Sequence, residues 1–381
     1  MIDFKLTPEQ ELIRKTVAEF AATVIAPVAA ELDEKQEFSM ELTRALARQG
    51  YLGIIIPPEY GGAGANTLTY CQVIEEVSKA CAAQGVTMSL SNSLVAYPIM
   101  TYGSEEIKRK YLPALASGEK LGCFGLTEPN AGSDSSNQET TAVDDGDAWV
   151  INGSKIFISN GGVADFAVII ASTNRAAKIR GLSAFIVDKG TPGFSVGVKE
   201  NKLGIRASNT AELVFQNCRI PKENILATPG RGFRIAMDTL DGGRIGVGAQ
   251  ACGIARAAYE AACKYAKERK QFGSALIDFQ GIAHKLADMR LEIETTRLLT
   301  WKAAWLKDNK KRFAKDAAMA KLYGSEMATR VAHQAIQIHG GYGFIKDYPV
   351  ERYYRDARIL ELYEGTSEVQ RMVIASYVLG V

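Results

Sequence analysis

The segment at 361–371 combines residue types that could carry out a proton transfer. It reads Glu-Leu-Tyr-Glu-Gly-Thr-Ser-Glu-Val-Gln-Arg, so Glu364 is followed directly by Gly365, Thr366 and Ser367. Gly365 lets the backbone approach a ligand closely, and either hydroxyl residue can cap a helix whose exposed N–H groups suit an anionic or carbonyl oxygen. Glu364 is therefore a candidate catalytic base. The segment alone fits an ordinary surface carboxylate before a capped helix equally well.

Two loops in the middle of the chain could line a polar cofactor. Residues 127–134 read Thr-Glu-Pro-Asn-Ala-Gly-Ser-Asp, and residues 157–162 read Phe-Ile-Ser-Asn-Gly-Gly. Both are dense in turn formers and hydroxyls, whose N–H and O–H groups can bind a polar ligand. Taken singly, each loop is explained as well by a plain surface turn.

Two segments in the last third could hold a phosphate group. Arg269 opens the run Arg-Lys-Gln-Phe-Gly, with Gln280 further on, although cations at a helix end ordinarily only complement its dipole. Residues 337–344 read Gln-Ile-His-Gly-Gly-Tyr-Gly-Phe, and the paired glycines admit a phosphate close to the backbone. The chain has neither a Gly-x-Gly-x-x-Gly fingerprint after an expected strand nor a Walker A sequence, which argues against Rossmann and nucleoside-triphosphatase folds.

Composition argues against several other classes. The 45 Lys and Arg against 43 Asp and Glu leave a net charge of +2, which gives no support to nucleic-acid binding. The six cysteines have no Cys-x-x-Cys spacing and the three histidines form no metal-binding pattern, so reduced thiols and no metal site are expected. We recognise no signal peptide and no membrane segment. The expected location is the cytoplasm, with a processed mitochondrial form as the alternative.

The hydrophobic period divides the chain into three expected domains. Helical spacing predicts an N-terminal helical domain over 1–120, β-branched clusters between turn residues predict a sheet over 121–231, and the helical period returns over 232–381. The expected fold class is α+β, with an antiparallel β-sheet or small barrel in the middle and a C-terminal four-helix bundle.

Two local patterns make sharper predictions. Thr7 and Gln10 form a capping box that opens the first helix, and that helix is expected to stop before Pro27. Asn152-Gly153 lies between two strand-like runs and predicts a two-residue hairpin.

Taken together, these stretches resemble the acyl-CoA dehydrogenase family over essentially all of the chain. Five motifs match in order: Leu126-Thr127-Glu128-Pro129 with Ala131-Gly132-Ser133-Asp134; Phe157-Ile158-Ser159-Asn160-Gly161; Leu240-Asp241-Gly242-Gly243-Arg244; Arg269 with Gln271-Phe272-Gly273; and Gln337 to Phe344 leading to Tyr363-Glu364-Gly365-Thr366. Each motif is weak alone, and the five together are highly specific.

The resemblance implies FAD between the sheet and the bundle. The implied cofactor residues are Phe124, Leu126, Thr127, Gly132, Ser133, Phe157, Ile158, Ser159, Arg269, Phe272, Gln280, Gln337, Gly340, Gly341, Thr366, Ser367 and Glu368. In the family the Arg269 and Gln337 groups act partly across a subunit interface, which implies a dimer and usually a homotetramer built as a dimer of dimers. Phe157 and Ser159 stand where the family often has Trp and Thr.

The resemblance also implies the reaction. Glu364 would remove an α proton from an acyl-CoA while FAD takes the β hydride, with the Glu364 N–H and a flavin hydroxyl holding the thioester carbonyl. Some members carry the base at the position of Gly243, which cannot act as one. The implied substrate-binding residues are Ser133, Asp241, Arg244, Tyr363 and Gly365.

The acyl group is less well defined. Members acting on dicarboxylyl substrates usually have arginine near Gly85, and the stretch at 88–94 resembles short-chain members, so a butyryl-sized group is expected. A small branched or alicyclic thioester, such as cyclohexane-carboxyl-CoA, is the nearest rival. Electrons would pass to an electron-transfer flavoprotein. The alternative from another class is a non-catalytic scaffold that keeps the fold.

Overall fold

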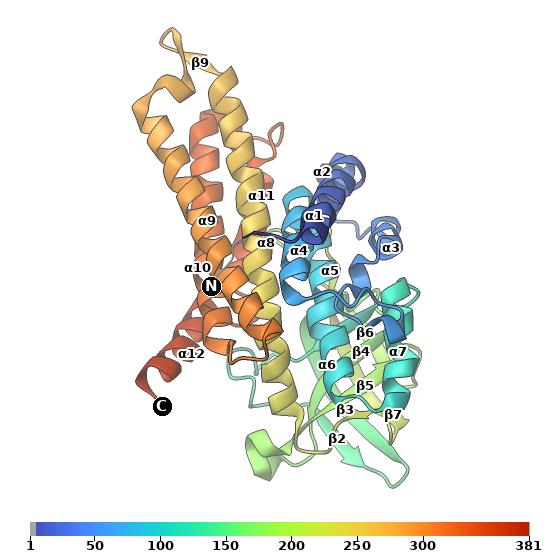
Figure 1. Ribbon diagram of the computed structural model, residues 1–381. Helices are drawn as coiled ribbons and strands as arrows, with labels where there is room; N and C mark the ends of the chain where they lie inside the picture. The colour runs from blue at the N-terminus through green and yellow to red at the C-terminus, as the bar shows by residue number, and fades with distance from the viewer. Residues whose placement is uncertain (1–4, 381) are drawn as a thin grey trace.

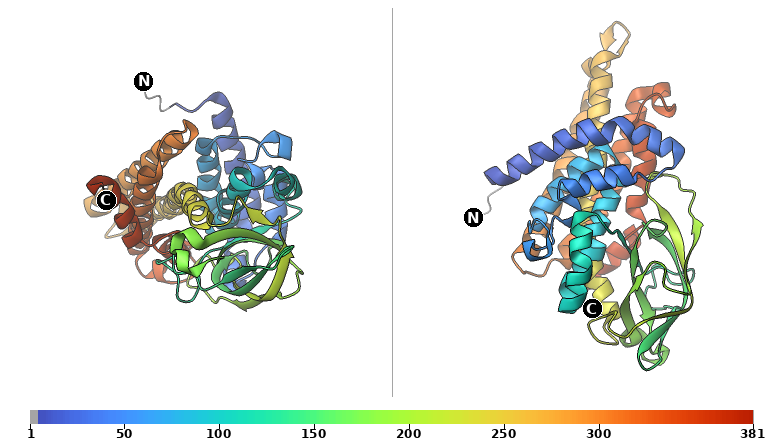
Figure 2. Two further views of the ribbon diagram at one scale, coloured as in Figure 1. Left: turned by 90° about the horizontal axis from the view of Figure 1, so that it is seen from below. Right: turned by 90° about the vertical axis from the view of Figure 1, so that its right-hand side faces the viewer.

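Along the chain, helices come before and after the segment that forms a β-sheet. The computed structural model describes residues 5–380, with N-terminal helices, then the sheet, then a bundle of long helices (Figure 1). Two further views show the sheet on one side of the helices (Figure 2). The expected α+β architecture is confirmed. Residues 1–4 and 381, the outer ends of the first and third expected domains, lie outside the described part.

Short helices build the N-terminal part. They are α1 (Pro8–Phe20), α2 (Ala26–Lys35), α3 (Met40–Arg48), α4 (Thr67–Ala80), α5 (Ala82–Leu90), α6 (Tyr97–Tyr102) and α7 (Glu105–Ser117). The capping box is confirmed, because Thr7 Oγ1 accepts from the Gln10 N–H at 3.2 Å and Gln10 Oε1 accepts from the Thr7 N–H at 3.1 Å. Within residues 5–380, no helix is both long and apolar enough to cross a membrane.

The prediction that the first helix stops before Pro27 is wrong. α1 runs through a π-helical turn at Ala21–Ile25 directly into α2. The Ala26 N–H bonds to the carbonyl of Ala21, five residues back, so the wide turn resets the hydrogen-bond ladder. Pro27 then falls in the first turn of α2, where a missing N–H is tolerated.

The middle part is one open sheet. Its strands are β1 (Gly122–Gly125), β2 (Thr141–Asp144), β3 (Ala148–Ser159), β4 (Phe166–Ser172), β5 (Leu182–Asp188), β6 (Phe194–Lys199), β7 (Thr210–Pro221) and β8 (Ile225–Leu226). In the described chain the order is β6-β7-β3-β2-β4-β5-β8, with β1 on β4. Most pairs are antiparallel as expected, but β1 and β2 both pair with β4 in parallel, so the purely antiparallel expectation is wrong there.

The predicted hairpin at Asn152-Gly153 is also wrong. β3 continues straight through both residues, with a register shift against β7 between Ile151 and Gly153. Gly153 has φ 141°, and a Cβ there would lie 2.5 Å from Thr140 Oγ1, so glycine serves a bulge and a close approach. Asn152 instead accepts a hydrogen bond from the Asn217 N–H at 2.7 Å.

Long helices build the C-terminal part. They are α8 (Gly232–Glu268), α9 (Gln280–Asp308), α10 (Ala314–His339), α11 (Val350–Arg358) and α12 (Ser367–Leu379), with a small β9 (Lys270–Gln271) and β10 (Ser274–Ala275) hairpin between α8 and α9. Small residues on α8 let α4 approach closely, since a Cβ on Gly253 would lie 2.4 Å from the Glu75 carbonyl oxygen. The helix therefore joins the N-terminal helices to the bundle.

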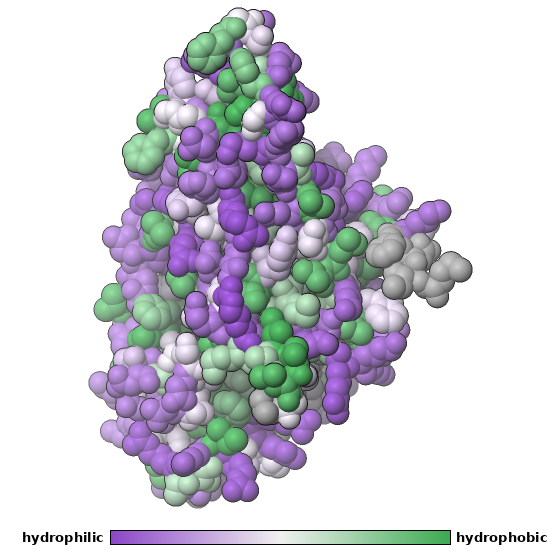
Figure 3. Space-filling view, turned by 90° about the vertical axis from the view of Figure 1, so that its left-hand side faces the viewer, coloured by the Kyte–Doolittle hydropathy of each residue, from purple (hydrophilic) through white to green (hydrophobic). Residues whose placement is uncertain are grey.

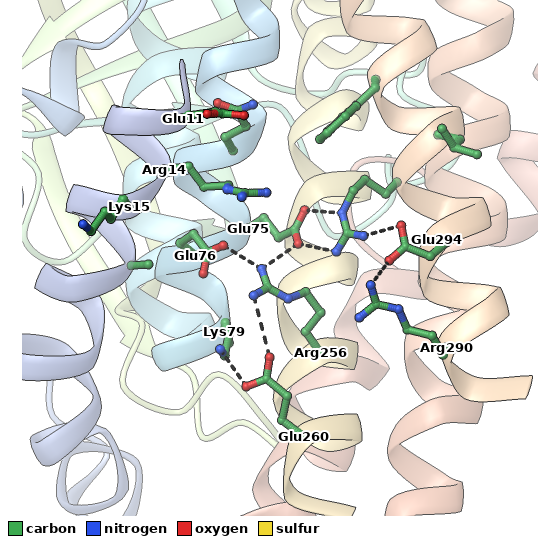
Figure 4. Close-up of a pocket in the computed structure, with 15 residues that line it drawn as sticks. Glu11, Arg14, Lys15, Glu75, Glu76, Lys79, Arg256, Glu260, Arg290 and Glu294 are labelled. Carbon is green, nitrogen blue, oxygen red and sulfur yellow. Dashed lines mark hydrogen bonds and ion pairs between the residues drawn. The ribbon is translucent and has the colours of Figure 1, made fainter. Parts of the chain in front are cut away.

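A buried ion-pair network ties the two helical parts together. Glu75 of α4 accepts from Arg256 of α8 at 2.8 Å and from Arg297 of α9 at 2.7 Å, and Glu76 accepts from Arg256 at 2.7 Å. Figure 4 shows these groups meeting in a hollow of about 940 Å³ between the helices. The arginines lower the pKa of Glu75 against the effect of burial, so this carboxylate stays ionised.

We expect Glu75→Gln to destabilise the protein by about 3 kcal/mol, because removing one partner of a buried pair leaves its arginines without full compensation. Urea unfolding measures the change. Glu31→Gln is the control, since Glu31 pairs with Lys35 on the surface and its loss should have little effect on the free energy of unfolding. Equal effects of the two substitutions would contradict the structural role of the network.

Candidate active site

Glu364 lies in a left-handed turn directly before α12. Glu364 has φ 53° and Gly365 has φ 91°. Glycine adopts this conformation freely, whereas glutamate loses about 1–2 kcal/mol in it. Thr366 ends the turn by capping α12, with its Oγ1 accepting from the Val369 N–H at 3.3 Å, as expected from the sequence. A strained non-glycine residue at this point indicates a functional constraint.

The Glu364 carboxylate occupies a low-dielectric site. Its Oε2 atom is buried and has no hydrogen-bond partner within residues 5–380. Burial raises the pKa of Glu364 to about 7, while Arg244 and Lys321 act in the opposite direction. A carboxylate whose pKa lies near neutrality can accept a proton efficiently under physiological conditions.

Gly243 makes room for this carboxylate. A Cβ at Gly243 would lie 2.0 Å from Glu364 Oε2 and 3.0 Å from Leu94 Cδ2. Any side chain on α8 at this position would therefore displace the Glu364 carboxylate. The absence of a side chain at Gly243 is therefore required for the Glu364 carboxylate to occupy this position.

Two residues of the site escaped the sequence analysis. Lys321 Nζ donates to the Gly365 carbonyl oxygen at 2.6 Å, and Gln370 Nε2 donates to the carbonyl oxygens of Glu364 and Gly365 at 3.1 and 2.9 Å. The signal for Lys321 was present, because it is a lone charge in the helical run Ala-Ala-Met-Ala-Lys-Leu at 317–322. Gln370 on α12 carried no distinguishing signal.

Of the expected substrate residues, Arg244 and Tyr363 lie close to Glu364, and Asp241 pairs with Arg244. Arg244 Nη1 donates to Asp241 Oδ1 at 2.5 Å, and Arg244 Nε donates to the Glu364 carbonyl oxygen at 3.5 Å. Burial raises the pKa of Asp241 and Arg244 opposes the shift. The Tyr363 hydroxyl donates to Gln250 Oε1 on α8. Their contact with a CoA thioester stays a prediction.

The sheet brings the two middle loops together. The Ile156 N–H donates to the Thr127 carbonyl oxygen at 2.9 Å, so the loop after β1 lies beside the end of β3. Phe157 has φ 59° and is 62% exposed, an apolar ring presented to solvent. The remaining expected residues of this group divide by burial: Phe124, Leu126 and Ile158 are buried, Ser159 is half-buried, and Gly132 and Ser133 are exposed.

A buried ion pair anchors the first of these loops. Lys155 Nζ donates to Glu128 Oε1 at 2.6 Å and to the Leu126 carbonyl oxygen at 3.3 Å. Both side chains are buried, at 0% and 1% exposed. Glu128 was expected only as part of the motif at 126–129, and no role was predicted for Lys155.

Six of the expected cofactor residues lie at the far end of the bundle, whereas Ser367 and Glu368 begin α12 directly after the Thr366 cap. A groove of about 470 Å³ is lined by Arg269, Gln271, His339, Gly340, Gly341 and Tyr342, among others. Phe272 is 96% exposed there, Gln280 begins α9, and Gln337 lies in the last turn of α10. Glu364 lies beside Gly243 of α8, whereas Arg269 of this groove directly follows the end of that helix, 26 residues further along and about 39 Å away at 1.5 Å per residue. One chain therefore does not bring all the expected cofactor residues together.

Comparisons with known proteins cover the whole fold. Family models match the N-terminal domain of acyl-CoA dehydrogenase at residues 7–119, the middle domain at 123–218 and the C-terminal domain at 230–379. A short-chain-specific acyl-CoA dehydrogenase of Clostridium acetobutylicum is 54% identical over 374 residues, 98% of this chain and 99% of that protein.

Solved structures agree with these matches. Butyryl-CoA dehydrogenase from Megasphaera elsdenii superposes with a TM-score of 0.98 at 48% identity, covering 99% of this chain and 100% of that chain. A chain from work on the electron-transferring flavoprotein of Acidaminococcus fermentans and flavin-based electron bifurcation matches with the same TM-score, identity and coverage. These comparisons define the class of the protein as a flavin-dependent oxidoreductase. The chain belongs to the acyl-CoA dehydrogenase family.

We expect Glu364→Gln to stabilise the flavin-bound protein at pH 8 by up to about 3 kcal/mol. The unfolded carboxyl group ionises near its ordinary pKa of 4.5, whereas the folded group holds its proton up to a pKa of about 7. The free energy of unfolding therefore falls through that window as pH rises, and the amide removes the loss. Thermal unfolding from pH 4 to pH 8 measures the difference, with the exposed Glu268→Gln as control. Parallel pH dependences of wild type and Glu364→Gln would contradict the raised pKa.

Proposed function

We propose that the chain catalyses the FAD-dependent α,β-dehydrogenation of a short-chain acyl-CoA to the 2-enoyl-CoA. The observation that carries this proposal is the Glu364 carboxylate, whose Oε2 is buried without a partner in the described chain and whose pKa is raised to about 7. The similarity to short-chain-specific and butyryl-CoA dehydrogenases supports the substrate class.

In the proposed reaction Glu364 Oε2 accepts the α proton of the thioester. An α C–H bond is a weak acid, so the thioester carbonyl oxygen needs fixed donors as negative charge develops on it. The Glu364 backbone N–H is the proposed donor from this chain, and the left-handed turn fixes its direction. Bound FAD supplies the acceptor for the β hydride.

The residues present fit FAD. Phe157 offers an exposed ring, and Ser367 Oγ at the start of α12 is buried without a partner among the described residues. Arg269 has no carboxylate within ion-pair distance in the described chain, and a Cβ on Gly340 or Gly341 would meet nothing within 4 Å. These features suit a flavin ring at the sheet and a pyrophosphate at the end of the bundle.

The separation of these two groups along α8 supports cofactor sites shared between subunits. Leu291, Leu298 and Trp305 recur at seven-residue intervals on α9 and are 66%, 49% and 50% exposed. Figure 3 shows apolar residues interrupting the hydrophilic surface on this side of the molecule. Such a stripe on a helix favours burial against another chain. A homotetramer, built as a dimer of dimers, is the proposed assembly.

Two further features of the proposal concern partners and location. The match to a chain from the electron-transferring flavoprotein work supports that kind of protein as electron acceptor. The cytoplasmic location stays a prediction from the sequence.

Packing around Gly85 supports a substrate without a distal carboxylate. Gly85 is buried in α5, and a Cβ there would lie 2.1 Å from Ser78 Oγ. The arginine that dicarboxylyl-specific members carry near this position has no space here. Straight short chains remain the first choice, with small branched or alicyclic groups as the alternative. The non-catalytic scaffold loses support because the strained, desolvated base is kept.

We expect butyryl-CoA to bleach the flavin of the purified yellow protein when oxygen is absent. Glu364→Gln should bind FAD and thioester but lower the rate of bleaching about 10²–10⁴-fold, the usual contribution of a general base. Stopped-flow absorbance measures the rate, and the exposed Glu119→Gln is the control. A colourless wild-type protein, or near-normal bleaching by Glu364→Gln, would overturn the proposal.

A panel of CoA thioesters tests the acyl group. We expect butyryl-CoA to give the highest kcat/KM, with a change of about 10–200-fold for one methylene more or less, corresponding to about 1–3 kcal/mol. Glutaryl-CoA should reduce the flavin far more slowly, because no arginine fits at Gly85. A higher kcat/KM for a cyclic or branched thioester would make the alternative the correct substrate class.

A further inference from the structure

Lys321 is a buried lysine that the proton transfer described above does not use. It lies on α10 with 0% of its surface exposed, and its Nζ donates to the Gly365 carbonyl oxygen at 2.6 Å. Fully buried lysines are rare, because an ammonium group loses its hydration inside a protein. Burial lowers the pKa of Lys321 to about 8, and Glu364 opposes that shift. A lysine that is buried at this cost and bonded to the Gly365 carbonyl indicates a role at the turn.

Side chains from three helices converge on the carbonyl oxygens of this turn. Gln370 of α12 donates to the carbonyls of Glu364 and Gly365, Arg244 of α8 donates to that of Glu364, and Lys321 of α10 donates to that of Gly365. Carbonyl oxygens fixed at successive peptides leave the chain little rotational freedom. The left-handed φ of Glu364 is thus held by contacts from outside the turn.

The ionised groups that act on the Glu364 carboxylate are cations. Arg244 and Lys321 are the cations that lower its pKa, against burial, which raises it. The neighbouring phenols of Tyr70 and Tyr363 have raised pKa values through burial and stay neutral. Arg244 is shared with Asp241 through an ion pair of 2.5 Å. Of the two cations, Arg244 has the larger effect on the pKa of Glu364, and the Lys321 charge adds to it.

The acidic groups near Lys321 are Glu364, Glu361 and Glu368. Glu361 is paired with Arg358 at 2.7 Å, and Glu368 is exposed at the start of α12. Glu364 is the first of the three in its effect on Lys321, so the lysine and the proposed base are electrostatic partners.

We propose that Lys321 is a positioning residue for the base: it fixes the Gly365 carbonyl, holds the turn that aims the Glu364 carboxylate, and keeps that carboxylate ionised. This inference rests on the proposed role of Glu364. It adds a residue on α10, distant in sequence, to the machinery of proton abstraction.

The test compares Lys321→Met with wild type in flavin-bound protein. We expect the pH midpoint of butyryl-CoA-dependent bleaching to move up by about one unit, because loss of a nearby opposite charge raises a carboxyl pKa. From a starting pKa of about 7, that shift alone lowers the rate at pH 7 about fivefold. FAD content should stay unchanged. Lys315→Met, on the exposed face of the same helix, is the matched control.

A second readout needs no turnover. The protonated carboxyl band of Glu364 is isolated by infrared difference spectroscopy between each protein and its Glu364→Gln form, and is followed against pH. The band should disappear at a higher pH in Lys321→Met than in wild type. Unchanged titration and an unchanged rate profile in the folded Lys321→Met protein would overturn the inference while leaving the proposed function intact.

Two further variants separate the effect of the Lys321 charge from its effect on the position of the turn. They also test the inference if Lys321→Met does not fold. Lys321→Arg keeps the charge, so the pH midpoint should stay near the wild-type value while the rate falls. Gln370→Leu removes two neutral hydrogen bonds to the turn, so the rate should fall without a shift in midpoint. An upward shift in Lys321→Arg, or a wild-type rate in Gln370→Leu, would contradict the inference. Loss of bleaching in wild type would instead refute the proposed function.

Discussion

Holding the Glu364 carboxylate away from water is the constraint on which the rest of the structure depends. Desolvation raises the pKa of this group to about 7, which makes it a useful base and also makes its charged form unfavourable. Two nearby cations, Arg244 and Lys321, favour the charged form. Side chains from three helices hold the strained turn in place. The proposed proton transfer accounts for this cost in stability.

Small residues on α8 make that arrangement sterically feasible. Gly243 leaves space for the Glu364 carboxylate, Gly246 admits the hydroxyls of Tyr70 and Ser89, and Gly253 lets the backbone of α4 come close. A helix with so many glycines has weak intrinsic propensity, so its stability comes from burial on nearly all sides. The Glu75 ion-pair network then fixes α4 against the bundle.

Much of this could be predicted from the sequence. The Thr366 cap was recognisable because local chemistry at a helix start follows from neighbouring residues, whereas the role of Glu364 came from the family resemblance and stays a prediction. The hairpin predicted at Asn152-Gly153 was wrong because the same dipeptide occurs in tight turns and in bulges. The contact with Thr140 that decides between them is tertiary. Lys321 was missed because its partner carbonyl lies 44 positions away, so the lone charge in its helical run does not reveal the contact.

The most direct test of Glu364 as the base uses acetyl-CoA, which has α protons but no β carbon from which a hydride could leave. In D₂O the flavin-bound protein should exchange the α protons of acetyl-CoA for deuterium, and mass spectrometry measures the exchange. If Glu364 is the base, wild type exchanges them and Glu364→Gln does so about 10²–10⁴-fold more slowly. Equal exchange by the two proteins would show that another group removes the proton.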